Sequence, residues 1–179
     1  ANILDFCLDK RVKHLLFASS QTVYGFPSSL NLTEETLCNP LEHYAASKVC
    51  AVQLLKLGTH TGLNVTVLRF PGLYGESRRE GMVYNFCQAA LSSGRIKVTI
   101  EYPLPLDIIH VEDVVYAFEK ALSYKAQGWN CLNIATGEAC SVNLLADAVA
   151  SLVPGCEVDY SSIPQPVITM NPSRAYELL

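Results

Sequence analysis

The stretch HLLFASS, residues 14–20, is a short apolar run that ends in two serines. A run of this length predicts a buried β-strand, which we place at about 14–19. A connection rich in Pro, Ser and Asn follows at 25–41, then a helical pattern at 42–58 and a second apolar run, NVTVLRF, at 64–70. Strands that alternate with helices are typical of βαβ units, so the sequence predicts an α/β fold with a parallel sheet.

The same alternation continues to the end of the chain. Further strands are expected at 96–100, 107–110 and 130–134, and further helices at 1–9, 81–93, 111–124, 141–152 and 172–179.

Composition excludes several classes of partner. The chain has 179 residues, of which 50% are hydrophobic, and a formal net charge of -4. Nucleic acids and anionic membranes bind concentrated positive surface, so neither is an expected partner. No apolar run approaches the roughly 18 residues of a membrane span, and we expect a cytoplasmic protein. Seven cysteines without a CxxC pair indicate free thiols, with no disulfide framework and no metal site.

Two tyrosines lie four residues before a lysine, a spacing that brings both side chains to one helix face. Tyr44 and Lys48 share their face with apolar residues of the helix at 42–58. Tyr116 and Lys120 instead share theirs with acidic residues, opposite the apolar side of the helix at 111–124. The second pair is therefore expected to face solvent, which makes the first pair the candidate for chemistry.

A lysine on an apolar face needs a physical reason, because burial of an unpaired ammonium is costly. One reason is catalytic: a positive charge within about 6 Å of a tyrosine favours the phenolate, which can exchange a proton with a substrate hydroxyl. The other is structural, since the aliphatic part of lysine often packs along apolar surface while its charge reaches water. The residues alone leave both readings open for Lys48.

Five motifs, in this order, resemble the extended short-chain dehydrogenase/reductase family, the NAD-dependent epimerases and dehydratases that act largely on nucleotide sugars. They are LLFASSQTVYG (15–25), HYAASK (43–48), VLRFPGLYG (67–75), DIIHVEDVVYAFEKAL (107–122) and LNIATGEACSV (132–142). The resemblance implies a partial Rossmann-type sheet at 1–75. It also implies a small substrate-side α/β lobe over most of 76–179, from which residues 107–134 return to the main sheet.

The resemblance implies roles for residues at the strand ends and at the start of the helix at 42–58. Tyr44 would be the general acid/base, and Lys48 would hold the nicotinamide ribose. Ser20 would bond the substrate hydroxyl or carbonyl at the reacting carbon. The neighbouring Ser19 would lie on the cofactor side, where a structural role is the alternative.

The loop after the second strand would border both ligands. Pro71 and Leu73 would lie against the nicotinamide, and Gly72 occupies a position that faces the substrate in the family. His110 would either contact the substrate or pack in the core. Asp113 is expected to cap the helix that follows it.

The chain departs from the family pattern in its glycines and in one arginine. Its ten glycines contain no GxxGxxG turn, so the pyrophosphate site and the N-terminal βαβ units are expected to be missing. The cofactor implied by the resemblance is NAD or NADP. Leu106 replaces an arginine that many members of the family place before Asp107. Arg69, Arg78 and Arg79 are candidates to replace that arginine in binding a sugar or nucleotide-sugar substrate, and for Arg78 and Arg79 the alternative is an ordinary surface position.

Two functions of different class therefore remain. The first is an NAD(P)-dependent epimerase, dehydratase or reductase that uses tyrosine as acid/base and is inactive as this truncated chain. The second is a non-catalytic binding or oligomerisation module. The helix at 42–58 is apolar nearly all round, which predicts a homodimer or a higher assembly in either case.

Overall fold

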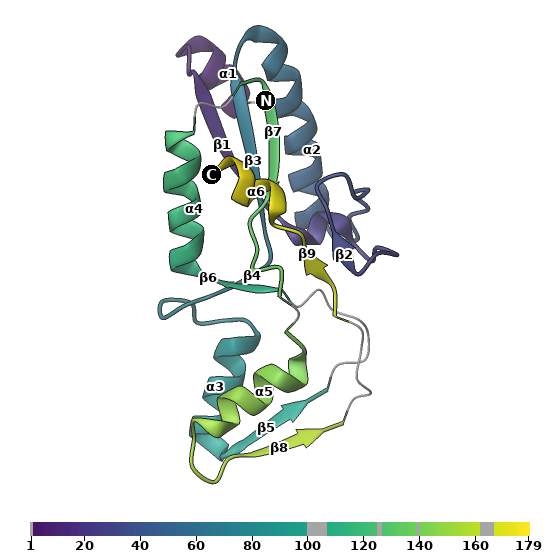
Figure 1. The fold of residues 1–179 in the computed structure, drawn as a ribbon, viewed down its shortest axis with the longest axis vertical. Helices are drawn as coiled ribbons and strands as arrows, with labels where there is room; N and C mark the ends of the chain where they lie inside the picture. Colours follow the sequence, from purple (N-terminus) through teal and green to yellow (C-terminus); the bar gives the residue numbers. More distant parts are fainter. Residues whose placement is uncertain (1, 100–106, 125–126, 139, 162–166) are drawn as a thin grey trace.

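The computed structural model describes residues 2–99, 107–124, 127–138, 140–161 and 167–179 (Figure 1). The helices are α1 Asn2–Asp9, α2 His43–Gly58, α3 Met82–Ser93, α4 Val111–Ser123, α5 Val142–Ser151 and α6 Ser173–Leu178, with short 3-10 helices at η1 Gln21–Tyr24 and η2 Thr59–Thr61. The strands are β1 His14–Ser20, β2 Asn31–Leu32, β3 Asn64–Phe70, β4 Gly72–Tyr74, β5 Arg95–Val98, β6 Ile108–His110, β7 Trp129–Asn133, β8 Glu157–Tyr160 and β9 Thr169–Met170.

The predicted α/β class is confirmed, and every predicted helix and strand is present, with ends that differ from the prediction by at most two residues. The predicted ends at residues 1 and 100 lie outside the described residues. The elements that the sequence did not predict are the short strands β2, β4, β8 and β9 and the two 3-10 helices. Each of these strands spans two to four residues. Such segments are too short to show a period, and their partners lie far away in the sequence.

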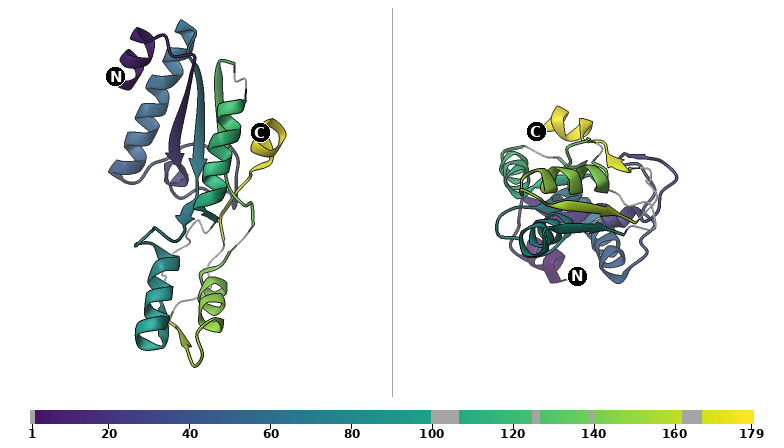
Figure 2. Two further views of the ribbon diagram at one scale, coloured as in Figure 1. Left: turned by 90° about the vertical axis from the view of Figure 1, so that its left-hand side faces the viewer. Right: turned by 90° about the horizontal axis from the view of Figure 1, so that it is seen from below.

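The main sheet is parallel and has the order β1-β3-β7. Helices α1 and α2 cover one face, whereas α4 lies on the opposite face and α6 packs beside β7 (Figure 2). β3 reads as a nearly continuous apolar run because it is buried on both faces. Val65 and Val67 pack towards the core under α1 and α2, and Leu68 and Phe70 belong to the core under α4 and α6.

A second, smaller cluster of elements contains α3, α5 and the parallel pair β5 and β8. It lies below the main sheet in Figure 1. β7 is a strand of the main sheet, and Ile109 of β6 and Val114 of α4 pack with Leu68 and Phe70 of that sheet. β9 pairs with β2 in a separate two-stranded sheet, and Ala175 of α6 joins the core of Leu68 and Phe70.

Asp107 ties these segments together just before β6. This fully buried carboxylate accepts hydrogen bonds from Thr136 N and Oγ1, Gly137 N and Met170 N, at 2.8 to 3.3 Å. A buried carboxylate needs such partners, because its charge is costly without them. Asp107 thereby links β6, the turn after β7 and the start of the C-terminal segment.

Three features of the chain's chemistry are visible in the described residues. All seven cysteines are free thiols, as the sequence predicted. Within the same ranges, no group of three or more His, Cys, Asp or Glu side chains is arranged to hold a metal ion. No helix in the part of the chain that the structure describes has the length and apolar character of a membrane span.

Candidate active site

The first turns of α2 present Tyr44 and Lys48 at the carboxyl end of β1. The Tyr44 side chain is 53% exposed, and Lys48 is half-buried. Lys48 Nζ donates a hydrogen bond of 3.0 Å to the carbonyl oxygen of Ala18, and it lies 5.1 Å from the ring centroid of Phe17 and 5.4 Å from that of Tyr44. The carbonyl and the two rings explain how an ammonium is accommodated on an apolar stripe.

Two serines end β1 next to this pair. Ser20 caps η1, since its Oγ accepts from Thr22 N at 3.2 Å and from Thr22 Oγ1 at 3.0 Å. The hydroxyl proton of Ser20 is not used in either bond and stays available for donation. Ser19 is buried, and its Oγ has no hydrogen-bond partner among the described residues. The strand end therefore offers one capped and one unpaired hydroxyl.

The register of the sheet places the loop after β3 beside these serines. Ser20 is aligned with Phe70, so Pro71 follows directly at the same edge. β4 then begins at Gly72, whose N–H donates to the carbonyl of Asp107 at 3.2 Å, and β4 pairs with β6. Thus the predicted residues Pro71, Gly72 and Leu73 lie at the carboxyl end of β3, where ligands bind in open α/β sheets.

His110 begins α4 and serves as its cap. Its Nδ1 accepts from Glu112 N at 3.4 Å, and its ring packs edge-on against Tyr74 at 5.2 Å between centroids. Asp113 lies in the first turn of α4, where its charge suits the helix dipole as predicted, but the capping hydrogen bond comes from the ring nitrogen of His110, one residue before the helix. His110 also borders a hollow of about 370 Å³ that Arg78 and Arg79 share.

Behind the strand ends lies a buried polar network that the sequence did not reveal. Tyr24 donates to Asn133 Oδ1 at 2.7 Å, and Arg69 Nη1 donates to Tyr24 Oη at 2.8 Å and to the carbonyl of Glu34 at 3.1 Å. Glu34 Oε1 in turn accepts from Asn133 N. Burial raises the pKa of Tyr24 to about 12, although the nearby Arg69 cation acts to lower it.

This network corrects the expectation for Arg69. The residue is only 7% exposed and its guanidinium is engaged by Tyr24 and Glu34, so it is not placed to bind a substrate diphosphate. Arg78 is exposed and bonds Glu80 at 3.3 Å. Leu106, the other substrate-side departure, lies outside the described residues. The sequence shows Tyr24 in VYG and Arg69 on a predicted strand, and these were the signals available for the network. Their pairing could not be predicted, because it depends on β1, β3 and β7 being adjacent.

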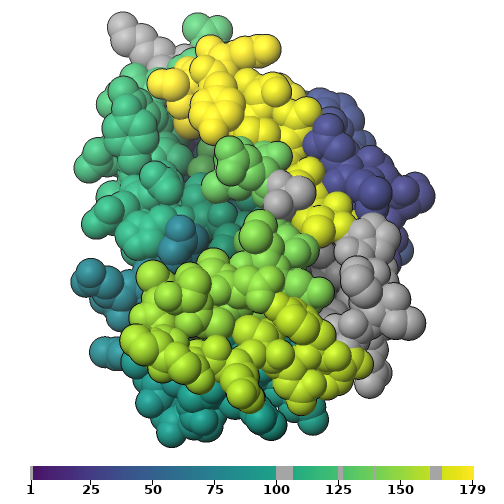
Figure 3. All heavy atoms as spheres, turned by 60° about the horizontal axis from the view of Figure 1, so that its bottom comes forward, coloured from purple at the N-terminus to yellow at the C-terminus, as the bar shows by residue number. Residues whose placement is uncertain are grey.

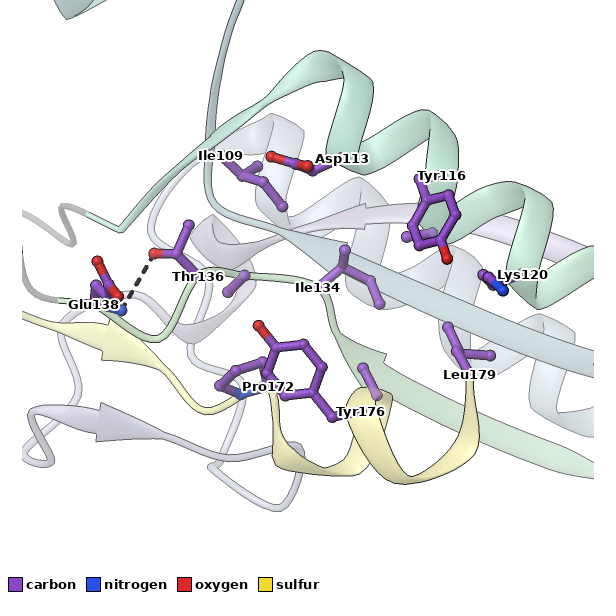
Figure 4. A pocket seen from close by; sticks show the side chains of 13 residues that line it. Ile109, Asp113, Tyr116, Lys120, Ile134, Thr136, Glu138, Pro172, Tyr176 and Leu179 are labelled. Carbon is purple, nitrogen blue, oxygen red and sulfur yellow. Dashed lines mark hydrogen bonds between the residues drawn. The ribbon is translucent and has the colours of Figure 1, made fainter.

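Of the second pair, Tyr116 is exposed as predicted, whereas Lys120 is half-buried like Lys48, and Lys120 Nζ lies 5.0 Å from the Tyr116 ring centroid. The pair borders a hollow of about 510 Å³ between α4, α6 and the segment after β7 (Figure 4). In Figure 3 the yellow C-terminal residues and the green residues after β7 lie on this face. Tyr44, Lys48 and Ser20 do not line this hollow. The volume of a hollow alone therefore does not identify the site of the proposed Tyr44 and Lys48 chemistry.

A parallel sheet with a tyrosine and a lysine on the helix after a serine-ended strand defines part of a dinucleotide-binding α/β protein. The model of the NAD dependent epimerase/dehydratase family matches residues 1–135. The chain belongs to this family, and the resemblance seen in its motifs is confirmed.

Individual relatives agree with the assignment. The UDP-glucose 4-epimerase of Lactobacillus helveticus is 28% identical over 185 residues, which cover 92% of this chain and 56% of the relative. The match to MoeE5, solved with UDP-glucuronic acid and NAD, covers 99% of this chain and 62% of the MoeE5 chain, with 28% identity and a TM-score of 0.81. The match to the UDP-glucose 4-epimerase of Thermotoga maritima, solved with UDP-glucose, covers 98% of this chain and 60% of that protein, with 25% identity and a TM-score of 0.80. The chain spans about half the length of the curated relatives it matches.

Proposed function

We propose that this chain is the catalytic part of an NAD-dependent epimerase or dehydratase that acts on a nucleotide sugar. The hydrogen bond from Lys48 to Ala18 carries this assignment, because it fixes the ammonium beside the Tyr44 ring at the carboxyl end of β1. Ser20 ends the same strand two residues after Ala18, and the register adds Pro71. A proton-transferring tyrosine, a fixed cation and a hydroxyl then share one edge of the sheet.

In this assignment Tyr44 Oη holds and moves the proton. Its side chain is more than half exposed, so a substrate hydroxyl can reach the phenol from solvent. The ammonium of Lys48 lies 5.4 Å from the centroid of the Tyr44 ring, so a positive charge stands beside the group that exchanges the proton. The free hydroxyl proton of Ser20 donates to the substrate oxygen and orients it, while its lone pairs remain engaged by Thr22.

The residues present fit the nicotinamide end of NAD. Lys48 uses one of its three N–H donors on Ala18, which leaves donors for a ribose hydroxyl. Ser19 Oγ is a buried hydroxyl without a partner in the described ranges, and Pro71 and Leu73 follow β3 at the same end of the sheet. Bound NAD supplies the hydride acceptor and donor that epimerases and dehydratases require.

The substrate side is assigned to the loop and helix beyond β3. Gly72 and His110 border it, and Arg78 and Arg79 lie at the adjoining hollow of about 370 Å³. Several relatives bind uridine diphosphate sugars, as MoeE5 does with UDP-glucuronic acid. A diphosphate favours charged arginine donors, so these two exposed arginines are the expected partners of such a group. The free cysteines suit a reducing compartment, and we place the protein in the cytoplasm.

Replacement of one hydroxyl tests the proposal. In a protein of the relatives' full length that carries these residues, Tyr44→Phe should reduce sugar interconversion by at least about 100-fold, the usual contribution of an acid/base group. Tyr116→Phe is the matched control, because Tyr116 also lies beside a lysine and is similarly exposed. Equal activity of the two variants would refute the role of Tyr44.

For the 179-residue chain by itself, we propose weak NAD binding and little or no turnover. The sequence has no GxxGxxG turn, and a dinucleotide takes much of its binding energy from that turn and the helix behind it. The residues present would hold only the nicotinamide end.

The second candidate function is self-association, with or without catalysis. α1 and α2 expose Ile3, Phe6, Leu54 and Leu57, each at least 45% accessible. Ile3 and Leu54 also border an apolar hollow of about 510 Å³ between the two helices and Phe17. Exposed apolar surface of this kind marks interfaces, so a second copy of this chain is the proposed partner. The oligomeric state tests it directly.

A further inference from the structure

Cys38 lies in the connection between β2 and α2, against the buried polar network. Its side chain is half-buried, and its Sγ accepts a hydrogen bond of 3.4 Å from Arg69 Nη2. Among the described residues, no other cysteine sulfur accepts a hydrogen bond from a charged side chain. Cys38 thus differs from the other six cysteines in this hydrogen bond and not in its exposure.

The guanidinium of Arg69 has one incompletely used edge. Nη1 already bonds Tyr24 and the Glu34 carbonyl, whereas Nη2 bonds only the Cys38 sulfur. Nε lies on the same edge as Nη2, is buried, and has no partner among the described residues. This side-on edge matches a pair of acceptor atoms, which is how arginine binds carboxylates. A neutral thiol leaves half of it unsatisfied, and a buried unpaired donor is costly.

We propose that Cys38 is a site of reversible oxidation by hydrogen peroxide, and that Arg69 holds the oxidised form. The Cys38 sulfur attacks one peroxide oxygen, so that an S–O bond forms as the O–O bond breaks. The sulfur loses two electrons, and the departing hydroxide takes up the thiol proton to leave as water. The product is a neutral sulfenic acid, whose new oxygen accepts the hydrogen bond that Arg69 Nε lacks. If the sulfenic acid then loses its proton to solvent, the guanidinium stabilises the resulting sulfenate anion.

The other cysteines lack this combination. Cys131 is also near the Arg69 cation, but it is buried. Burial raises its pKa to about 11, although Arg69 acts to lower that pKa, and this keeps Cys131 in the unreactive thiol form. Cys50 on α2 is more exposed than Cys38 but has no guanidinium at its sulfur in the described residues. Access alone therefore favours Cys50, and a preference of the oxidant for Cys38 would have to come from Arg69.

Oxidation at this position affects the segment that leads to Tyr44. Asn39, the next residue, packs its carbonyl against Gly25 so closely that a Cβ on Gly25 would lie 2.0 Å from the oxygen. An added oxygen on Cys38 gives the connection between β2 and α2 a further hydrogen bond to Arg69 of β3, and so holds this tightly packed segment more firmly against the sheet. The modification itself does not depend on the proposed enzyme activity.

The test is site-resolved trapping of sulfenic acid. The folded chain is treated with hydrogen peroxide and dimedone, and the labelling rates at Cys38 and Cys50 are compared by peptide mass spectrometry. We expect Cys38 to label at least about 5-fold faster than Cys50, and we expect this preference to disappear in urea because it depends on folded contacts. Label at Cys38 no faster than at Cys50 in the folded chain would overturn the proposal.

An arginine variant provides a second check. Arg69→Lys keeps the positive charge but removes the two-donor edge, and circular dichroism establishes whether it folds. A folded variant should lose the preference for Cys38, and an unchanged preference would contradict the role of Arg69. If the variant does not fold, the comparison of folded and urea-unfolded wild type still decides the proposal.

Discussion

Lys48 Nζ donates its hydrogen bond to the carbonyl oxygen of Ala18, which joins the first turns of α2 to the carboxyl end of β1. The bond is 3.0 Å long and connects residues 30 positions apart in the sequence. It satisfies an ammonium that would otherwise be unpaired on an apolar helix face, and it holds that charge beside Tyr44. A structural and a catalytic reading of this lysine are therefore compatible.

Loss of this charge should affect turnover more than stability. In a protein of the relatives' full length, Lys48→Met should lower kcat by at least about 100-fold, because the cation that supports proton transfer is gone. The folded state loses one partly exposed hydrogen bond, or about 1 kcal/mol. Steady-state kinetics and urea unfolding measure both quantities. Lys120→Met removes a lysine with a similar position over a tyrosine ring and should leave kcat unchanged.

NADH titration of the 179-residue chain should show weak binding. Isothermal calorimetry should give a dissociation constant of about 1 mM or weaker, since the residues for the pyrophosphate are not among its motifs. A micromolar constant would show that the phosphate turn is dispensable here.

Self-association should depend on the face formed by α1 and α2. Leu54→Glu places a charge beside the apolar hollow and should shift the sedimentation profile from an oligomer to a monomer. Leu122→Glu on α4 changes another exposed leucine and should not alter the profile. A wild-type chain that sediments as a monomer at high concentration would contradict the proposed interface.

Alkaline pH should destabilise the fold through Tyr24, whose pKa is raised to about 12 by burial. Below pH 10 the phenol is protonated in both the folded and the unfolded state. Between pH 10 and 12 only the unfolded state loses the proton, so the free energy of unfolding falls as pH rises, by about 3 kcal/mol over this range.

Tyr24→Phe isolates this contribution from other groups that titrate. The variant should be less stable at pH 8, because Arg69 and Asn133 lose a buried partner. Its urea midpoint should nevertheless decline less steeply than that of the wild type from pH 9 to 11. Parallel curves for the two proteins would show that the Tyr24 proton is not retained on folding.

Asp107→Asn should reduce stability by about 3 kcal/mol, since an amide places N–H donors against the donors of Thr136, Gly137 and Met170. Thermal unfolding measures the loss. The matched change Asp159→Asn, at an exposed position in β8, should cost less than about 0.5 kcal/mol. Similar costs at both positions would mean that the four bonds to Asp107 contribute little.

The long elements were predictable because each carries its own signal. β3 is apolar at nearly every position, and α4 has an apolar stripe of which Val114 and Ala121 become buried. Alternation of such segments specifies a parallel sheet for steric reasons that do not depend on the partner. The short pairs β2 with β9 and β5 with β8 had no such signal, because two to four residues acquire strand geometry only from a distant neighbour.

The sequence by itself determined the fold class and the family motifs. It also predicts Tyr44 and Lys48, in place of Tyr116 and Lys120, as the catalytic pair, because periodicity indicates which helix face is apolar. Only the tertiary structure decided what the buried polar groups do. Arg69 looked like a ligand for phosphate, and the adjacency of β1, β3 and β7 instead encloses it with Tyr24 and leaves one edge facing Cys38. Hydrogen-bond partners of buried charges come from residues far apart in the chain, and no local pattern encodes their pairing.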